Sequence, residues 1–180
     1  LLLGKPMVLW VAELSSKAVG INNVYVATDD TNIKNVVEDA GYQVVLTSES
    51  ALTGTDRLAE AAAQIDADIY INVQGDEPLV DPADIIKVRD KKIINMDKVI
   101  NGYCWISNDE HHHSVNIPKV VTTENDQLIY MSRSVIPGYK DATSAPEGYK
   151  KQVCIYAFTR AELESFSAFG RKSRLEYSED

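Results

Sequence analysis

Cysteines are few in this sequence, and long apolar runs are missing. Its two cysteines, Cys104 and Cys154, each lie in an apolar stretch, which argues against a disulfide framework and predicts buried thiols in a reducing cytoplasm. No apolar run approaches the ~20 residues that cross a bilayer. The opening leucines have no basic residues before them, so they do not resemble a signal peptide. We expect a cytoplasmic protein without membrane insertion.

Positive charge and nucleophilic motifs are also scarce. Eighteen Lys and Arg against 27 Asp and Glu give a net charge of −9, which argues against a nucleic-acid partner because phosphates need a cationic face. A single nucleotide can still bind where local cations or a metal ion offset the charge. There is no convincing Ser-His-Asp order. The adjacent histidines at 111–113 point in different directions, so we expect a solvated loop there rather than a metal site.

The composition is that of one globular domain. The chain has 180 residues, 44% of them apolar and 25% charged, which is enough for a sizeable core. It opens on a leucine run without an initiator Met and closes on a charged segment. We therefore expect a single domain over residues 1–180 that is incomplete at both ends.

Helical and extended patterns alternate along the first two-thirds of the chain. Asp30 or Thr31 is a suitable helix cap, and Asp81 before proline starts another helix. Such alternation indicates an α/β fold with a mostly parallel sheet. We expect helices at residues 6–20, 31–40, 55–65 and from 81, and strands at 24–27, 43–47 and 68–73.

The last third has a different pattern. Two β-type runs, at residues 119–123 and 127–131, flank a polar turn and predict a hairpin. Residues 153–158 form another expected strand. Thr159 and Glu162 have the spacing of a capping box, which predicts a helix through Phe169. The sheet should therefore carry a C-terminal antiparallel part.

Three polar segments follow the expected strands, at residues 28–30, 47–57 and 74–78. Ligands of open α/β sheets bind beyond the carboxyl ends of the strands. In Gln74-Gly-Asp-Glu-Pro78 the glycine permits close approach of a ligand, and a carboxylate there can hold Mg²⁺. In Thr53-Gly-Thr-Asp-Arg57 the amides and hydroxyls can bind phosphate, sugar or base. Each segment also has a plainer interpretation, as a strand-end turn or a helix cap.

A series of motifs runs in order along nearly the whole chain. The most specific is Asn72-Val-Gln-Gly-Asp-Glu-Pro78. The others are Gly4-Lys-Pro-Met7, Val26-Ala-Thr-Asp29, Thr47-Ser48, Gly54-Thr-Asp-Arg57, Lys119-Val-Val121, Ser132-Arg133, Ile155-Tyr156 and Leu175-Glu176. Together they resemble the motifs of one family, the 3-deoxy-manno-octulosonate cytidylyltransferases (CMP-Kdo synthetases).

This resemblance implies a Rossmann-like, three-layer nucleotide-diphospho-sugar transferase fold and an enzyme of lipopolysaccharide synthesis. The anomeric hydroxyl of a Kdo-like sugar acid would attack the α-phosphorus of CTP, pyrophosphate would leave, and Mg²⁺ would be required. It also implies a homodimer, with residues 120–131 as the interface. By resemblance, the catalytic residues are Asp76, also the magnesium ligand, and Arg133, and the substrate-binding residues are Gln74, Gly75, Thr53, Gly54, Thr55, Arg57, Gln152 and Tyr156.

The sequence departs from the family pattern at several places. The family's opening strand with its Arg- and Lys-containing phosphate loop, and its second metal-binding aspartate, have no counterpart here. Gln152 and Ala51 stand where the family has histidines. Since position 152 resembles one that meets the sugar, a related 3-deoxy sugar acid or an amino derivative of Kdo is open as acceptor. Two alternatives remain: a sialic-acid cytidylyltransferase, and a truncated non-catalytic relative that only binds nucleotide.

Overall fold

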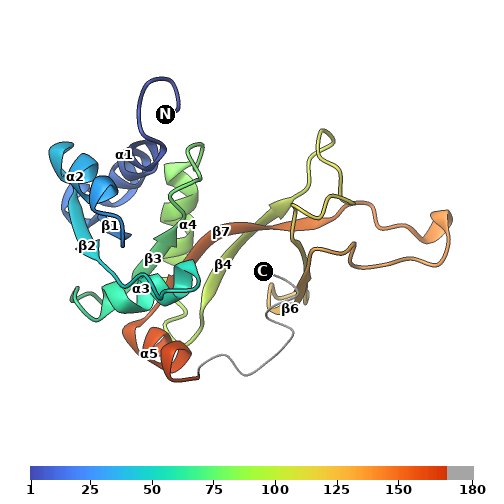
Figure 1. The fold of residues 1–180 in the computed structure, drawn as a ribbon. Helices are drawn as coiled ribbons and strands as arrows, with labels where there is room; N and C mark the ends of the chain where they lie inside the picture. The colour runs from blue at the N-terminus through green and yellow to red at the C-terminus, as the bar shows by residue number, and fades with distance from the viewer. Residues whose placement is uncertain (170–180) are drawn as a thin grey trace. The chain divides into compact units, whose positions relative to one another are not determined.

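A computed structural model describes residues 1–169 of the chain (Figure 1). These residues form two compact units, which are described separately. The first unit contains Leu1–Ile100 and the residues from Cys154 onward, and the second contains Asn101–Val153. Strand β7 (Lys150–Phe158) contributes residues to both. The expectation of a single domain over residues 1–180 stays a prediction.

The first unit contains the alternating helices and strands that the sequence predicts. Among residues 1–169 no helix is both long and apolar enough to cross a bilayer. In chain order the unit comprises α1 (Met7–Val19), the 3-10 turn η1 (Ile21–Asn23), β1 (Tyr25–Thr28), α2 (Thr31–Asp39), β2 (Gln43–Leu46), α3 (Gly54–Ala62), β3 (Tyr70–Val73), α4 (Pro82–Ile93), the end of β7, and α5 (Arg160–Phe169).

Helix caps fix where these helices begin. The Asp30 carboxylate accepts hydrogen bonds from the amides of Asn32 and Ile33, and Asp81 caps α4 ahead of a proline in the first turn. Glu162 accepts a bond of 2.7 Å from the amide of Thr159, which confirms the capping box that opens α5. The predicted starts of these helices are therefore confirmed.

The sheets are mixed, and the α/β class is confirmed. Strand β1 pairs in parallel with β2. Strand β3 instead pairs antiparallel with β7, with Tyr70 opposite Phe158 and Val73 opposite Ile155. The sheet is therefore less parallel than the sequence predicts, because β3 and β5 (Lys119–Thr122) both pair antiparallel with β7.

The core of the first unit gathers around α3, α5 and β3. Helix α3 packs beside α5, and α1 packs beside α4 (Figure 1). Tyr70, Phe158 and Leu163 are buried against one another together with Ala62. The Tyr70 hydroxyl donates to the Ile65 carbonyl at 2.7 Å, which satisfies a polar atom inside this core.

A buried ion pair joins α4 to α5. Lys92 is fully buried, and its ammonium donates to the Glu162 carboxylate at 2.7 Å and to the Lys98 carbonyl at 2.6 Å. Burial by itself raises the pKa of Glu162, but the bonds from Lys92 and Thr159 outweigh burial and lower the pKa overall. The carboxylate therefore stays charged beside the buried ammonium.

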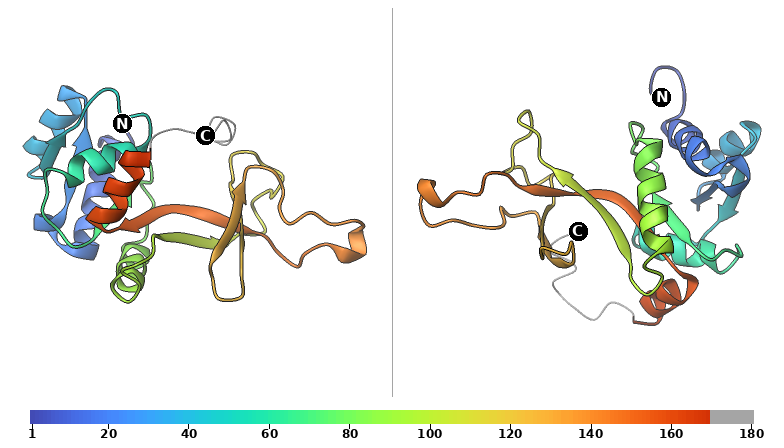
Figure 2. Two further views of the ribbon diagram at one scale, coloured as in Figure 1. Left: turned by 90° about the horizontal axis from the view of Figure 1, so that it is seen from below. Right: turned by 180° about the vertical axis from the view of Figure 1, so that it is seen from behind.

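The second unit is built on antiparallel strands, drawn in yellow to orange in Figure 2. Strand β5 (Lys119–Thr122) pairs with β6 (Leu128–Ser132), which confirms the predicted hairpin, and Asp126 in its turn has a φ of 58°. Strand β4 (Ile100–Trp105), which the sequence patterns did not predict, pairs with β7, and the 3-10 turn η2 covers Ala142–Ser144.

The expectation of two buried thiols is wrong for Cys104. This side chain is exposed on β4, whose last two residues, Cys104 and Trp105, both face solvent. Cys154 is half-buried on β7, and neither thiol forms a disulfide. An apolar stretch at a strand end was therefore not enough to predict burial.

Candidate nucleotide site

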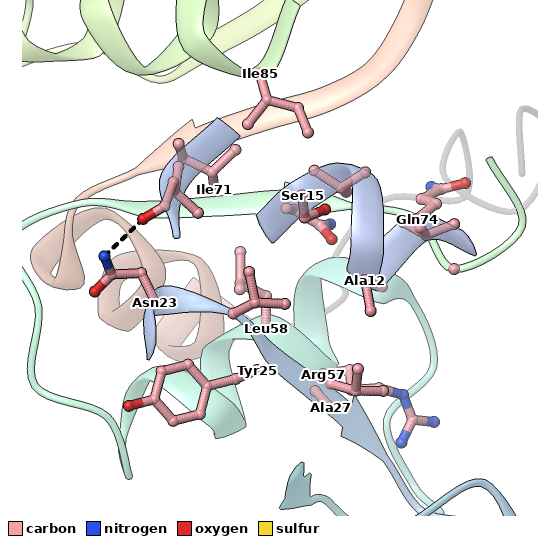
Figure 3. A pocket seen from close by; sticks show the side chains of 18 of the residues that line it. Ala12, Ser15, Asn23, Tyr25, Ala27, Arg57, Leu58, Ile71, Gln74 and Ile85 are labelled. Carbon is pink, nitrogen blue, oxygen red and sulfur yellow. Dashed lines mark hydrogen bonds between the residues drawn. The ribbon is translucent and has the colours of Figure 1, made fainter. Parts of the chain in front are cut away.

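The three polar segments that follow β1, β2 and β3 lie around one cavity of the first unit. Its volume is about 1070 Å³. Figure 3 shows Arg57 and Gln74 at one end of this space. The lining at that end comes from the carboxyl ends of β1 and β3 and the start of α3: Thr28, Gly54, Arg57, Gln74, Gly75 and Asp76. We call these six residues the carboxyl-end cluster.

Arg57 connects helix α3 to the segments that follow β1 and β2. Its guanidinium lies on α3, donates to the Thr47 hydroxyl after β2 at 2.5 Å, and pairs with the Asp29 carboxylate after β1 at 3.2 Å. One guanidinium nitrogen, Nη1, makes both contacts. The sequence marked Arg57 as a ligand-binding residue, but its link to Asp29 spans 28 positions and could not be predicted from local spacing.

The first turn of α3 is placed close to β3. The Thr53 hydroxyl accepts from the Asp56 amide at 3.2 Å, and the Asp56 carboxylate accepts from the Thr53 amide at 2.9 Å, which forms a capping box. A Cβ on Gly54 would lie 3.6 Å from the side-chain amide of Asn72, an ordinary van der Waals contact, so the helix start lies directly beside the strand. Thr53 thus caps the helix, and Thr55, half-buried in its first turn, follows Gly54.

The Gln74–Pro78 segment makes a turn directly after β3. The Glu77 amide donates to the Gln74 carbonyl at 3.2 Å, which folds the chain back and leaves Asp76 exposed at the cavity. The same turn keeps Gln74 half-buried in the cavity wall. A solvent-facing carboxylate beside an amide can contact a metal ion and a polar substrate at the same time.

Tyr156 lies in the first unit on β7, where its register partner is Asn72 of β3. Its ring stacks on Phe158 with a centroid separation of 6.1 Å. Burial raises the pKa of Tyr156 to about 12, so the hydroxyl keeps its proton at neutral pH. The side chain therefore contributes to the core packing as well as lying next to a strand of the candidate site.

Arg133 and Gln152 lie in the second unit. The Arg133 guanidinium donates to the Val115 carbonyl at 3.1 Å, and the backbone N–H of Gln152 donates to the Pro118 carbonyl at 3.0 Å. In the same unit His112 stacks on Tyr149, with ring centroids 4.5 Å apart. The structure thus brings Gly54, Arg57 and Gln74–Asp76 together, while the roles predicted for Arg133 and Gln152 stay predictions.

Comparisons with known proteins agree on one family. A model of the cytidylyltransferase family matches residues 1–180. The 8-amino-3,8-dideoxy-manno-octulosonate cytidylyltransferases of Shewanella pealeana and Shewanella baltica (strain OS185) are 39% and 38% identical over 181 residues, which cover 96% of this chain and 73% of each relative. Among the matching motifs, Leu175-Glu176 lies outside the described residues.

Solved structures show the same relationship. The CMP:2-keto-3-deoxy-manno-octonic acid synthetase complexed with CTP superposes with a TM-score of 0.87 at 35% identity, covering 97% of this chain and 71% of that one. A cytidylyltransferase from Leptospira borgpetersenii, at 15% identity and a TM-score of 0.56, shares the fold over 92% of this chain and 54% of its own. With the family model matching its full length, the chain belongs to the cytidylyltransferase family.

Proposed function

We propose that this chain transfers CMP from CTP to a 3-deoxy-manno-octulosonate sugar acid and releases pyrophosphate, in the cytoplasm and for surface polysaccharide. The observation that carries the proposal is the convergence of the carboxyl-end cluster on one cavity of the first unit. The relatives named for this reaction match 96% of the chain, and the synthetase of similar structure is complexed with CTP.

The reaction needs positioning and charge neutralisation more than covalent catalysis. The sugar hydroxyl oxygen forms a bond to the α-phosphorus, its proton is released, and the bond from that phosphorus to the pyrophosphate oxygen breaks. Arg57, already held by Asp29 and Thr47, presents a positively charged group at the cavity of a chain whose net charge is −9. The amino terminus of α3, beside Gly54, adds backbone amides that point out of the helix end.

Asp76 fits the role of magnesium ligand. Mg²⁺ is usually held by one or two carboxylates plus substrate phosphates and water, so it needs no all-protein cage. Among residues 1–169 no group of three potential ligand side chains gathers at one point, while Asp76 offers an exposed carboxylate at the cavity. When bound, the ion would offset charge on the phosphates. Asp76 would hold it while Gln74 contacts the sugar.

The acceptor class follows from the relatives. The curated relatives are named for the 8-amino sugar, and the synthetase of known structure is named for the sugar without that amino group. Both are 3-deoxy-octulosonic acids. The roles that the resemblance implies for Arg133, Gln152 and Tyr156 suit either acid, because an arginine can bind a sugar carboxylate as a charge-assisted pair. This class is favoured over sialic acid, for which no such relative appears among the matches described above.

An acceptor panel tests the proposal. Pyrophosphate release from CTP and Mg²⁺ is measured with Kdo, with its 8-amino derivative, with N-acetylneuraminic acid and with no sugar. We expect release with one or both octulosonic acids, at rates at least about tenfold above the sialic acid reaction. Equal release without any sugar would indicate a CTP hydrolase. Absence of release together with CTP binding would identify a non-catalytic relative.

We further propose that the β5–β6 hairpin forms a homodimer interface. On β6, Leu128, Ile129 and Tyr130 are 54%, 61% and 45% exposed, and apolar surface of this kind favours association. Light scattering should give twice the chain mass for the wild type and a monomer for Ile129→Lys. A wild-type monomer at micromolar concentration would contradict this interface.

A further inference from the structure

The loop that leads from β2 into α3 is exposed, so burial does little to hold it. Residues 48–50 are exposed, and the Leu52 side chain is 71% exposed. A backbone bond within the loop, from the Ala51 amide to the Ser48 carbonyl, is long at 3.4 Å. The loop ends at Thr53, which caps α3 beside the carboxyl-end cluster. Contacts that fix this loop therefore also fix how the start of α3 is presented to a ligand.

One face of α3 holds the start of this loop. Arg57 and Glu60 are three positions apart on the helix, so their side chains are neighbours on its surface. Arg57 donates to the hydroxyl of Thr47, the residue after β2, and Glu60 bonds to the next residue, Ser48. Two α3 side chains therefore hold two consecutive residues at the point where the chain leaves the strand.

The Glu60 carboxylate makes two bonds to Ser48. One oxygen accepts from the Ser48 backbone N–H at 2.6 Å, and the other accepts from the Ser48 hydroxyl at 2.5 Å. The same hydroxyl lies 2.9 Å from the Ser50 hydroxyl, which extends the contact into the loop. Hydrogen bonds to a carboxylate are stronger than those between neutral groups. The bonds from Ser48 lower the pKa of Glu60, so the carboxylate stays charged at neutral pH.

We propose that Glu60 is a positioning residue for nucleotide binding, which fixes the loop at Ser48 and so holds the start of α3 in place for CTP. This inference rests on the proposed function. With Ser48 held and Thr53 inside the capping box, residues 49–52 are the part of the loop left between two fixed points. Ordering a free loop when a ligand binds costs conformational entropy, and a loop that is ordered beforehand avoids that cost.

Glu60 differs from a surface glutamate that only supports its own helix. Glu38 on α2 is an example of that simpler role, because its carboxylate pairs with Lys34 one turn earlier at 2.5 Å. Glu60 instead bonds to a residue 12 positions away, on the far side of the loop. Loss of the Glu60 carboxylate should therefore loosen the loop and leave the helix formed.

Steady-state kinetics of the full chain, with CTP, Mg²⁺ and the octulosonic acid that releases most pyrophosphate, test this role. Glu60→Ala removes both bonds but keeps α3, because alanine is the best helix former. We expect its KM for CTP to rise about tenfold, with kcat and the KM for the sugar within about twofold of the wild type. In Glu60→Gln the oxygen can accept from the Ser48 amide and the NH₂ can donate to the Ser48 hydroxyl, so this variant should restore the KM for CTP. The control Glu38→Ala should leave that KM unchanged.

Two further measurements need no turnover. Hydrogen exchange of the Ser48 amide should be at least about tenfold faster in ligand-free Glu60→Ala than in the wild type. Calorimetry should show that Glu60→Ala binds CTP with Mg²⁺ about tenfold more weakly. Ser48→Ala keeps the backbone bond but loses the hydroxyl, so it should weaken CTP binding about threefold in the wild-type chain and no further in Glu60→Ala.

The outcomes separate this inference from the proposed function. Unchanged CTP affinity in Glu60→Ala, an equal loss in Glu38→Ala, or losses at Ser48 and Glu60 that simply add would overturn the role of Glu60 and leave CMP transfer intact. Failure of the wild-type chain to bind CTP would overturn both.

Discussion

The first unit holds two groups of charged side chains that differ in their surroundings. Lys92 is completely buried on α4, and its ammonium is satisfied by Glu162 and by backbone carbonyls. Asp76 is exposed at the cavity, on a turn after β3. A buried charge must be compensated within the fold, whereas an exposed one can take a ligand. We therefore expect changes in the first group to affect stability and changes in the second to affect activity.

Removal of the buried ammonium should have the largest effect. Lys92→Met leaves the Glu162 carboxylate without its main partner, and we expect a loss of about 3 kcal/mol in the free energy of unfolding. Chemical denaturation measures it. The matched control is Lys91→Met, at an exposed neighbour, which should change stability by less than about 0.5 kcal/mol. Equal losses of unfolding free energy in both variants would contradict burial as the cause of the effect at Lys92.

Removal of the exposed carboxylate should lower activity and leave stability almost unchanged. Asp76→Asn keeps the shape of the side chain but not its charge, and we expect turnover to fall at least about 100-fold and its Mg²⁺ dependence to disappear. The unfolding free energy should stay within about 0.5 kcal/mol of the wild type. Glu77→Gln, at the adjacent exposed acid, is the control and should retain activity. Mg²⁺-dependent turnover in Asp76→Asn would contradict the assignment.

Arg57 lies between these extremes, because it is paired within the fold and also lines the cavity. Arg57→Lys keeps the charge but loses the planar guanidinium whose Nη1 contacts both Asp29 and Thr47, so we expect about a tenfold loss in kcat/KM, mainly through KM for CTP. Steady-state kinetics measure it. The control is Arg89→Lys, which lines the same cavity and pairs with Asp90. A similar loss of kcat/KM in Arg89→Lys would contradict a specific role of Arg57 in binding CTP.

The smallest expected effect is on the pH dependence of stability. Because the pKa of Glu162 is lowered in the folded chain from its usual 4.5, this group stabilises the fold above that pH, and the contribution is lost as pH falls through the lowered pKa. Glu162→Gln should therefore be less stable than the wild type near neutral pH, with the difference shrinking below about pH 4.5. A difference that is constant with pH would contradict the ion pair as its source.

Local patterns predicted much of this fold and part of the site. Capping residues such as Asp30 and Asp81 predicted where helices start, and the Gln74-Gly-Asp-Glu-Pro78 motif predicted a polar turn at a strand end. Such features depend on neighbours a few positions away, which a sequence displays directly. That polar residues from these segments line one cavity followed from the rule that ligand sites lie beyond the carboxyl ends of strands.

Other features depend on contacts that local spacing does not contain. Lys92 and Glu162 are 70 positions apart, and nothing in either segment identifies the partner. Strand β4 carries Asn101 and Gly102 in an irregular apolar pattern, so its pairing with β7 was missed.

The most direct test of the central claim follows the α-phosphorus of CTP. The full chain is incubated with CTP labelled at that phosphorus, Mg²⁺ and the octulosonic acid that releases most pyrophosphate, and the products are separated. We predict that the label appears in a sugar nucleotide while the released pyrophosphate is unlabelled, and that Asp76→Asn forms at least about 100-fold less of this product. Label recovered only as CTP or as CMP would contradict cytidylyl transfer at this site.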